Sequence, residues 1–203
     1  MTEKRPDVTL VGIGALGSFM AMALCKDGWE VLAADPDVVE EHNVRNQVYS
    51  IDDVGKHKVA ALEQYCAGNL QMYEGYANLR ATGSTSVVIC TPDDMQTRRL
   101  IWNQAKGSDR LLYYMEARGG GEVLYIYAVN PRDEKAVKAY ERTFDGEIQK
   151  TALCGIGPFC GMMVAGYMVA ALRDLRTQSG EMPSWQIMGN VLATDMFKSS
   201  LAC

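Results

Sequence analysis

Three glycines near the N-terminus and an aspartate that follows them have the types and spacing of a ligand site. Gly12, Gly14 and Gly17 fit the pattern G-x-G-x-x-G between an apolar run and a segment with helical spacing. Glycines in that context permit a tight turn and let backbone N–H groups face a phosphate. Asp35 follows Gly12 by 23 residues, where a carboxylate can accept hydrogen bonds from ribose hydroxyls. The pattern predicts an adenine nucleotide site; the alternative is glycines that serve close helix packing alone.

A βαβ unit must position these residues. Residues 7–11 predict a strand, residues 15–27 a helix that ends before Gly28, and residues 29–34 a second strand. The second strand is apolar without alternation, which is typical of a parallel strand covered on both faces. The glycine turn is therefore expected at the carboxyl end of the first strand.

The rest of the chain alternates helices and strands before its pattern changes. Helices are predicted over residues 56–70, 94–106, 131–144 and 161–175, and strands over residues 72–77, 86–91, 111–116 and 123–129. Residues 117–122 are interpreted as a connection short enough to make the last two strands antiparallel, and residues 185–203 as a closing segment of undecided structure. We predict an α/β fold with a Rossmann-like, mixed and mostly parallel β-sheet flanked by helices.

Composition restricts the classes of function. The chain has 203 residues, 48% of them hydrophobic, which predicts one substantial core. A net charge of −5 without a basic block predicts no nucleic-acid partner. The first residues form no apolar signal, and the most apolar stretch, residues 162–172, is about half of the ~20 residues that span a bilayer. We therefore expect a cytoplasmic protein with no membrane partner. Six cysteines without a C-x-x-C pair predict free thiols and no structural zinc.

The loops after the predicted strands distinguish between classes of nucleotide. Residues 35–47 read DPDVVEEHNVRNQ, residues 54–58 read VGKHK, and residues 88–94 read VICTPDD. These segments resemble the ThiF/MoeB/HesA family of ubiquitin-activating-enzyme-like adenylyltransferases, whose signature is D-x-D-x-V, N-x-x-R-Q, G-x-x-K and C-T-D-N. In this alignment one residue is missing between Asn43 and Arg45. Residues 116–122, EARGGGE, resemble the glycine and arginine segment of the family.

The resemblance implies an activity and its partners. The family binds ATP with magnesium and adenylates a C-terminal carboxylate, usually that of a ubiquitin-like or sulfur-carrier protein, with release of pyrophosphate. The acceptor expected here is such a protein or a peptide with a free C-terminal carboxylate, and the expected assembly is a homodimer or heterodimer. Residues 1–203 would form a single adenylation domain, with a nucleotide-binding half over residues 1–108 and a mixed-strand and helical remainder over residues 109–203.

The resemblance also implies roles for particular residues. A carboxylate that attacks an α-phosphate builds negative charge, which fixed cations stabilise, and it needs no general base. The nucleotide would be bound by the glycine turn and by Asp35, Asp37 and Asn43, with Arg45 and Lys58 supplying positive charge and Asp93 holding magnesium. Cys154 precedes a predicted helix, where a thiol pKa can be lowered, and later cysteines accept acyl or sulfur groups in several family members.

Each assignment has a structural alternative. Arg45 and Lys58 can be solvated charges, Asp93 can cap the helix that follows it, and Cys154 can be a buried hydrophobic residue. Arg118 is either a turn residue in contact with solvent or a residue that binds the acceptor tail. His42 and His57 are interpreted as surface residues.

Three features depart from the family. The N-terminal helix with an arginine that reaches a partner subunit's nucleotide is missing, the paired zinc cysteines are missing, and the segment after Val129 is short. The chain therefore resembles a minimal member. Two alternatives stay open: an NAD(P)-dependent oxidoreductase, which needs only the glycine turn and Asp35, and a non-catalytic nucleotide-binding partner subunit.

Overall fold

One mixed β-sheet runs through the part of the chain that the computed structural model describes, which is residues 6–66, 68–79, 85–120, 123–145, 158–177, 183–190 and 195–201. The strands follow the order β3-β2-β1-β4-β5-β6-β7-β8. Their bounds are β1 Val8–Val11, β2 Val31–Asp35, β3 Leu70–Glu74, β4 Val87–Cys90, β5 Tyr113–Gly120, β6 Val123–Val129, β7 Trp185–Asn190 and β8 Asp195–Ser200. Strands β3, β2, β1, β4 and β5 are parallel, and β6, β7 and β8 continue the sheet in antiparallel pairing. The predicted fold class is confirmed.

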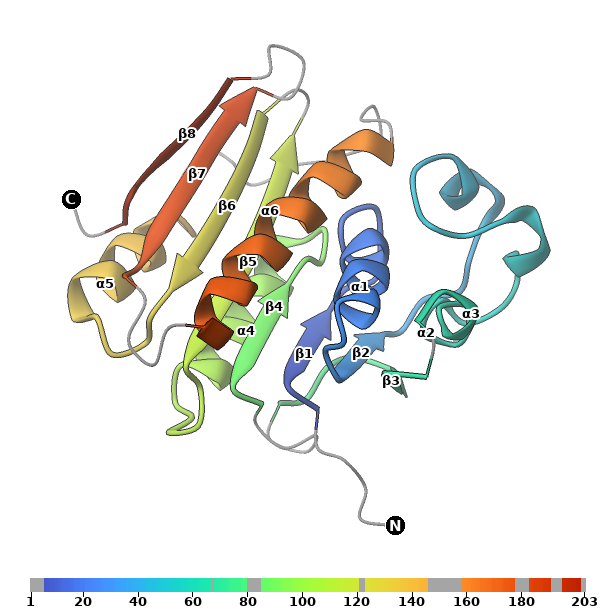
Figure 1. Cartoon of the computed structure of the whole chain (residues 1–203), viewed down its shortest axis with the longest axis horizontal. Helices are drawn as coiled ribbons and strands as arrows, with labels where there is room; N and C mark the ends of the chain where they lie inside the picture. The colour runs from blue at the N-terminus through green and yellow to red at the C-terminus, as the bar shows by residue number, and fades with distance from the viewer. Residues whose placement is uncertain are drawn as a thin grey trace.

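Helices cover both faces of this sheet. Their bounds are α1 Gly17–Lys26, η1 Glu41–Arg45, η2 Ile51–Asp53, α2 Lys58–Ala61, α3 Glu63–Cys66, α4 Met95–Ala105, α5 Glu134–Arg142 and α6 Pro158–Thr177, where η1 and η2 are 3₁₀ turns. Helices α1 and α6 lie side by side on one face, and α4 and α5 lie on the other (Figure 1). Among the helices of the described residues, none is long and apolar enough to cross a membrane.

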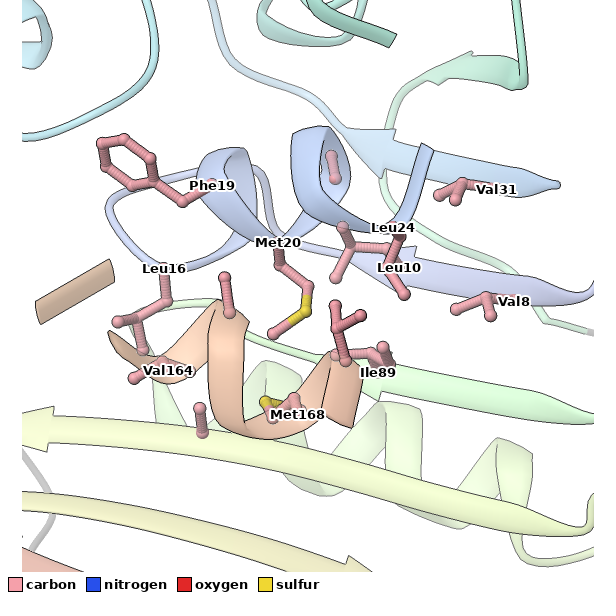
Figure 2. Packing of buried hydrophobic residues seen from close by; sticks show 14 of the residues in the cluster. Val8, Leu10, Leu16, Phe19, Met20, Leu24, Val31, Ile89, Val164 and Met168 are labelled. Carbon is pink, nitrogen blue, oxygen red and sulfur yellow. The ribbon is translucent and has the colours of Figure 1, made fainter. Parts of the chain in front are cut away.

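The core between α1, α6 and the sheet fixes the position of the glycine turn. Leu10 of β1, Met20 of α1, Ile89 of β4 and Met168 of α6 are fully buried, and their side chains gather between the two helices and the strands (Figure 2). Gly161 lets α6 come close to the turn, because a Cβ there would overlap the Ala15 carbonyl oxygen. The packing therefore holds the residues that precede α1 against the sheet.

The strand order reverses direction between β1 and β4. From β1 the chain proceeds outward to β2 and β3, and it then returns to place β4 on the other side of β1. Beyond the two carboxyl ends, the N–H of Thr91 donates to the Val11 carbonyl oxygen at 2.8 Å, and the Thr91 hydroxyl donates to the Gly12 carbonyl oxygen at 2.7 Å. Such a switch point is where open α/β sheets bind ligands.

The helix predicted over residues 56–70 is wrong as a single element. It is divided into α2 and α3, and the N–H of Tyr65 bonds the Leu62 carbonyl oxygen three residues back. The side chains of Gln64 and Tyr65 both donate to the buried carboxylate of Asp53. These tertiary bonds hold the segment against η2 in place of a continuous helix.

The antiparallel pairing predicted for the strands on either side of residues 117–122 is confirmed, but the predicted bounds of their connection are wrong. Strand β5 continues through Gly120, and its pairing with β6 extends to the register Gly120 opposite Val123. Charge and three glycines indicated a loop, whereas Arg118 is buried in the strand by a local ion pair. The undecided segment over residues 185–203 contains the antiparallel hairpin of β7 and β8.

Candidate nucleotide site

A cavity of about 570 Å³ opens at the carboxyl ends of β1, β2 and β4. This volume is in the usual range for small-molecule sites. Its lining comes from the glycine turn, the end of β2, η1, the start of α2, the residues after β3 and the start of α4. Seven of the residues predicted from the sequence meet there: Gly12, Gly14, Asp35, Asp37, Asn43, Lys58 and Asp93.

The three glycines of the turn are required for different reasons. Gly12 has φ +86°, and a Cβ there would lie 2.6 Å from the Pro92 backbone nitrogen. A Cβ on Gly17 would overlap the Gly12 carbonyl oxygen, so no side chain fits. Gly14 lines the cavity and has no atom within 4 Å of its Cβ position. Close packing therefore explains Gly12 and Gly17, whereas Gly14 leaves room for a ligand to approach the backbone.

Asp35 is buried and holds two backbone segments together. One carboxylate oxygen accepts the Ile13 N–H at 2.5 Å, and the other accepts the Asp37 N–H at 2.8 Å. Burial raises the pKa of Asp35, and the two N–H donors and the charge of Lys58 partly offset that effect. Each oxygen retains a lone pair for a further donor, so the carboxylate can bind ligand hydroxyls while it fixes the turn.

Lys58 brings a positive charge into the cavity. Its side chain is only 9% exposed, whereas the side chain of Asp37 is 62% exposed. The Lys58 ammonium nitrogen lies 2.7 Å from a carboxylate oxygen of Asp37. Among the described residues that line the cavity, Lys58 is the only lysine or arginine. The alternative of a solvated surface lysine is therefore wrong.

Arg45 is not brought into the cavity. It lies exposed at the end of η1, whereas Asn46 and Gln47 line the cavity. Counted from Asn43 without a gap, the signature N-x-x-R-Q places its arginine at Asn46 and its glutamine at Gln47. In this register no residue is missing and Asn46 takes the place of the signature arginine, and both Asn46 and Gln47 line the cavity. Neither residue is among the predicted site residues, although direct counting of the signature from Asn43 identifies both.

Asn46 and Gln47 carry buried acceptors that point to a ligand. Within the described structure, Asn46 Oδ1 and Gln47 Oε1 are buried and have no hydrogen-bond partner. A buried amide oxygen without a donor costs free energy, and a ligand donor in the cavity would remove that cost. Asn43, by comparison, has local partners: its Oδ1 accepts the Glu40 N–H at 2.9 Å, and its Nδ2 lies 3.0 Å from His42 Nε2.

Asp93 and Asp94 have separate positions at the start of α4. Asp94 caps the helix, because its carboxylate accepts the Thr97 N–H at 2.7 Å. The alternative in which Asp93 is the cap is therefore wrong, and Asp93 lies exposed on the cavity lining. No group of three or more His, Cys, Asp or Glu residues suited to a metal occurs in the described part of the chain. Mg²⁺ commonly takes one or two carboxylates together with substrate phosphates, and Asp93 fits that donor set.

None of the described cysteines lines the cavity. Cys154 lies outside the described residues, so its predicted role is not tested. Cys25, Cys66, Cys90 and Cys160 are free and buried. Burial raises the pKa of Cys90 to about 12 and that of Cys160 to about 11, so these two thiols stay protonated at neutral pH.

Arg118 belongs to a buried ionic cluster beside the cavity. Its guanidinium contacts the carboxylate of Glu116, which also accepts a hydrogen bond from Arg98 at 2.9 Å and one from the Tyr140 hydroxyl. Burial opposes ionisation of Glu116, but the two arginines outweigh it and hold its pKa below the usual value. The alternative of a solvent-facing turn residue is wrong for Arg118. The cluster ties α4, whose first turn lines the cavity, to β5.

Comparisons with known proteins agree with the fold. The model of the ThiF family matches residues 4–201. The crystal structure of PaaA is 18% identical with a TM-score of 0.73, and the alignment covers 96% of this chain and 63% of PaaA. The structure of E. coli MccB with AMPCPP and MccA is 14% identical with a TM-score of 0.69, covering 97% of this chain and 63% of MccB. A search of curated proteins finds no match. The chain thus spans less than two thirds of either solved protein.

Proposed function

The chain belongs to the ThiF family, and on that premise we propose that it is an ATP-dependent adenylyltransferase. It activates the C-terminal carboxylate of a peptide or protein as an acyl-adenylate and releases pyrophosphate. One observation carries this proposal: a single cavity contains an open glycine at the turn, a buried carboxylate and a buried lysine, namely Gly14, Asp35 and Lys58.

Five of the cavity residues have distinct roles in this chemistry. The acceptor carboxylate attacks the α-phosphorus of ATP, and the bond to pyrophosphate breaks. Lys58 stabilises the negative charge that develops on the phosphates. Asp35 accepts hydrogen bonds from the ribose hydroxyls, and the open position at Gly14 lets the phosphates approach backbone N–H groups. Asn43 and Gln47 contribute polar groups from the loop. Arg45 was assigned a phosphate role by resemblance, but its exposed position outside the cavity gives that role no support.

Magnesium completes the proposed site. Asp93 would hold it together with the phosphates, and the metal would supply neutralisation of phosphate charge. The cavity lining itself argues for an added cation. It carries five carboxylates, at Asp35, Asp37, Glu40, Asp93 and Asp94, against the one charge of Lys58.

The acceptor is proposed from the chemistry and from one solved relative. The MccB structure holds AMPCPP and MccA together, which supports a site shared by a nucleotide and a second molecule. We propose a peptide or a ubiquitin-like or sulfur-carrier protein with a free C-terminal carboxylate. We also propose that residues 1–203 act as one adenylation domain, since a single sheet runs from the cavity strands into β5 to β8. The dimer implied by the family resemblance stays a prediction.

Pyrophosphate exchange tests the proposed reaction. The protein is incubated with Mg-ATP, labelled pyrophosphate and a random-sequence peptide mixture ending in free carboxylates, and the control mixture is identical except for amidated C-termini. Label should enter ATP with the first mixture alone. ATP binding without exchange in either mixture would favour the non-catalytic subunit. Hydride exchange with NAD(P) would favour the oxidoreductase, which leaves Lys58 and Gln47 without a role.

A further inference from the structure

A ring of hydrogen bonds links the glycine turn, the end of β2 and the start of α2 at the candidate site. The Asp35 carboxylate joins the N–H groups of Ile13 and Asp37. The Asp37 carbonyl oxygen accepts the Lys58 N–H at 2.9 Å, and the Asp37 carboxylate binds the Lys58 ammonium at 2.7 Å. These bonds connect the glycine turn to the start of α2 by way of the end of β2.

Tyr49 completes this ring, because its hydroxyl lies near both Ile13 and Lys58. Its hydroxyl lies 3.1 Å from the Ile13 carbonyl oxygen and 3.2 Å from the Lys58 carbonyl oxygen. The side chain is buried, and burial is the first cause that raises its pKa far above the usual value, so the hydroxyl remains a donor. The neighbouring Val48 N–H donates to the Ser18 hydroxyl at 3.2 Å, which anchors this loop to α1.

The Tyr49 hydroxyl has more acceptors within hydrogen-bond distance than a buried hydroxyl requires. One acceptor would satisfy its single proton, yet it lies between two carbonyl oxygens that belong to the two sides of the proposed phosphate site. Tyr49 itself does not line the cavity. Any effect on a ligand must therefore pass through Ile13 and Lys58.

We infer that Tyr49 is a positioning residue: its hydroxyl sets the spacing between the glycine turn and Lys58, so that both meet the phosphates of one nucleotide. This inference rests on the proposed function. Without the hydroxyl, the carbonyl groups of Ile13 and Lys58 lose their shared donor, and the turn and the lysine can move apart.

The test compares two variants that each remove one hydroxyl. Tyr49→Phe removes the shared donor. The matched control is Tyr65→Phe, because the Tyr65 hydroxyl donates to Asp53 at 3.0 Å and forms no hydrogen bond with Ile13 or Lys58 in the described structure. Two quantities are measured for the wild type and both variants: amide hydrogen exchange at Ile13 and Lys58 without ligand, and the dissociation constant for Mg-ATP.

Tyr49→Phe is expected to accelerate exchange at both amides and to weaken Mg-ATP binding by about fivefold, the effect of one net hydrogen bond. Tyr65→Phe should change neither quantity by more than about twofold. Unchanged Mg-ATP affinity in a folded Tyr49→Phe protein would overturn the inference and leave the proposed function intact, as would equal weakening by both variants. Absence of Mg-ATP binding by the wild type would instead overturn the proposed function, and with it this inference.

Discussion

The Lys58 ammonium lies 2.7 Å from the Asp37 carboxylate, and the lysine is the buried member of this pair. In the proposed site, a nucleotide phosphate replaces the Asp37 carboxylate as the partner of the ammonium, so the positive charge is held in position before the nucleotide binds. Asp37, which is mostly exposed, then keeps access to water. We therefore propose that Lys58 is a cation held in position for the phosphates. An exposed surface salt bridge, by contrast, contributes little free energy to folding.

Lys58→Ala is expected to weaken Mg-ATP binding by at least about tenfold, because a charge-assisted contact to a phosphate contributes about 1.5–3 kcal/mol. Arg45→Ala should change the same dissociation constant by less than about twofold, since Arg45 is exposed and outside the cavity. Calorimetric titration with Mg-ATP measures both. A larger effect from Arg45 than from Lys58 would show that the site is assigned to the wrong cation.

Gly14→Ala and Gly17→Ala are expected to fail in different ways. A methyl group at Gly14 projects into open space at the cavity, so the protein should fold with stability within about 1 kcal/mol of the wild type and bind Mg-ATP more weakly. A methyl group at Gly17 overlaps the Gly12 carbonyl oxygen, which should cost about 3 kcal/mol or more. Urea unfolding and nucleotide titration separate the two effects. Equal loss of stability would contradict the distinction between the glycines.

Asp93→Asn is expected to raise the magnesium concentration needed for half-maximal ATP binding by about tenfold, because an amide is a poorer ligand for Mg²⁺ than a carboxylate. Asp94→Asn is the matched control, since asparagine caps a helix about as well as aspartate. Titration of ATP binding against magnesium gives both values, and chelation of the metal should weaken binding to the wild type. Identical magnesium dependence in the two variants would remove Asp93 from the proposed site.

The stability of the segment around η2 is expected to depend on acid pH through Asp53. Burial opposes ionisation of Asp53, but hydrogen bonds from the Ser50 N–H, Lys56, Tyr65 and Gln64 outweigh it and hold the pKa well below its usual value. A depressed pKa in the folded state adds stability above the unfolded value of about 3.9, and this stability is lost as the pH falls below it.

Asp53→Asn should therefore lower the free energy of unfolding at pH 7 by about 2–3 kcal/mol and reduce the further loss between pH 4 and pH 2. Urea unfolding at several pH values measures the two slopes. If the variant and the wild type lose stability equally over that interval, Asp53 does not carry the acid dependence.

The glycine turn, Asp35 and Lys58 could be predicted because each depends on short-range sequence pattern. The turn needs a strand before it and a helix after it, and Asp35 needs only the end of the next strand. Both signals are local, and the parallel order of β1 and β2 brings them to one sheet edge. Lys58 keeps a fixed spacing from Gly55 in the family signature, and the bridge between Val38 and His57 carries it to the cavity.

The burial of Arg118 and the position of Tyr49 could not be predicted, because both depend on contacts distant in sequence. Arg118 looks like a loop residue beside three glycines, but its register opposite Tyr125 in β6 makes it part of a strand, and Arg98 of α4 shares the Glu116 carboxylate with it. Tyr49 resembles a loop aromatic until the fold places Ile13 and Lys58 on either side of its hydroxyl. No local pattern carries such information.

Nucleotide preference is the most direct test of the central claim. The melting temperature of the protein is compared with Mg-ATP, NAD or NADP at equal concentration, for the wild type and for Lys58→Ala. A ligand at about 100 times its dissociation constant adds roughly 2.7 kcal/mol of stability. The account predicts a rise with Mg-ATP alone, and a smaller rise in Lys58→Ala. A rise with NAD or NADP and none with Mg-ATP would contradict it.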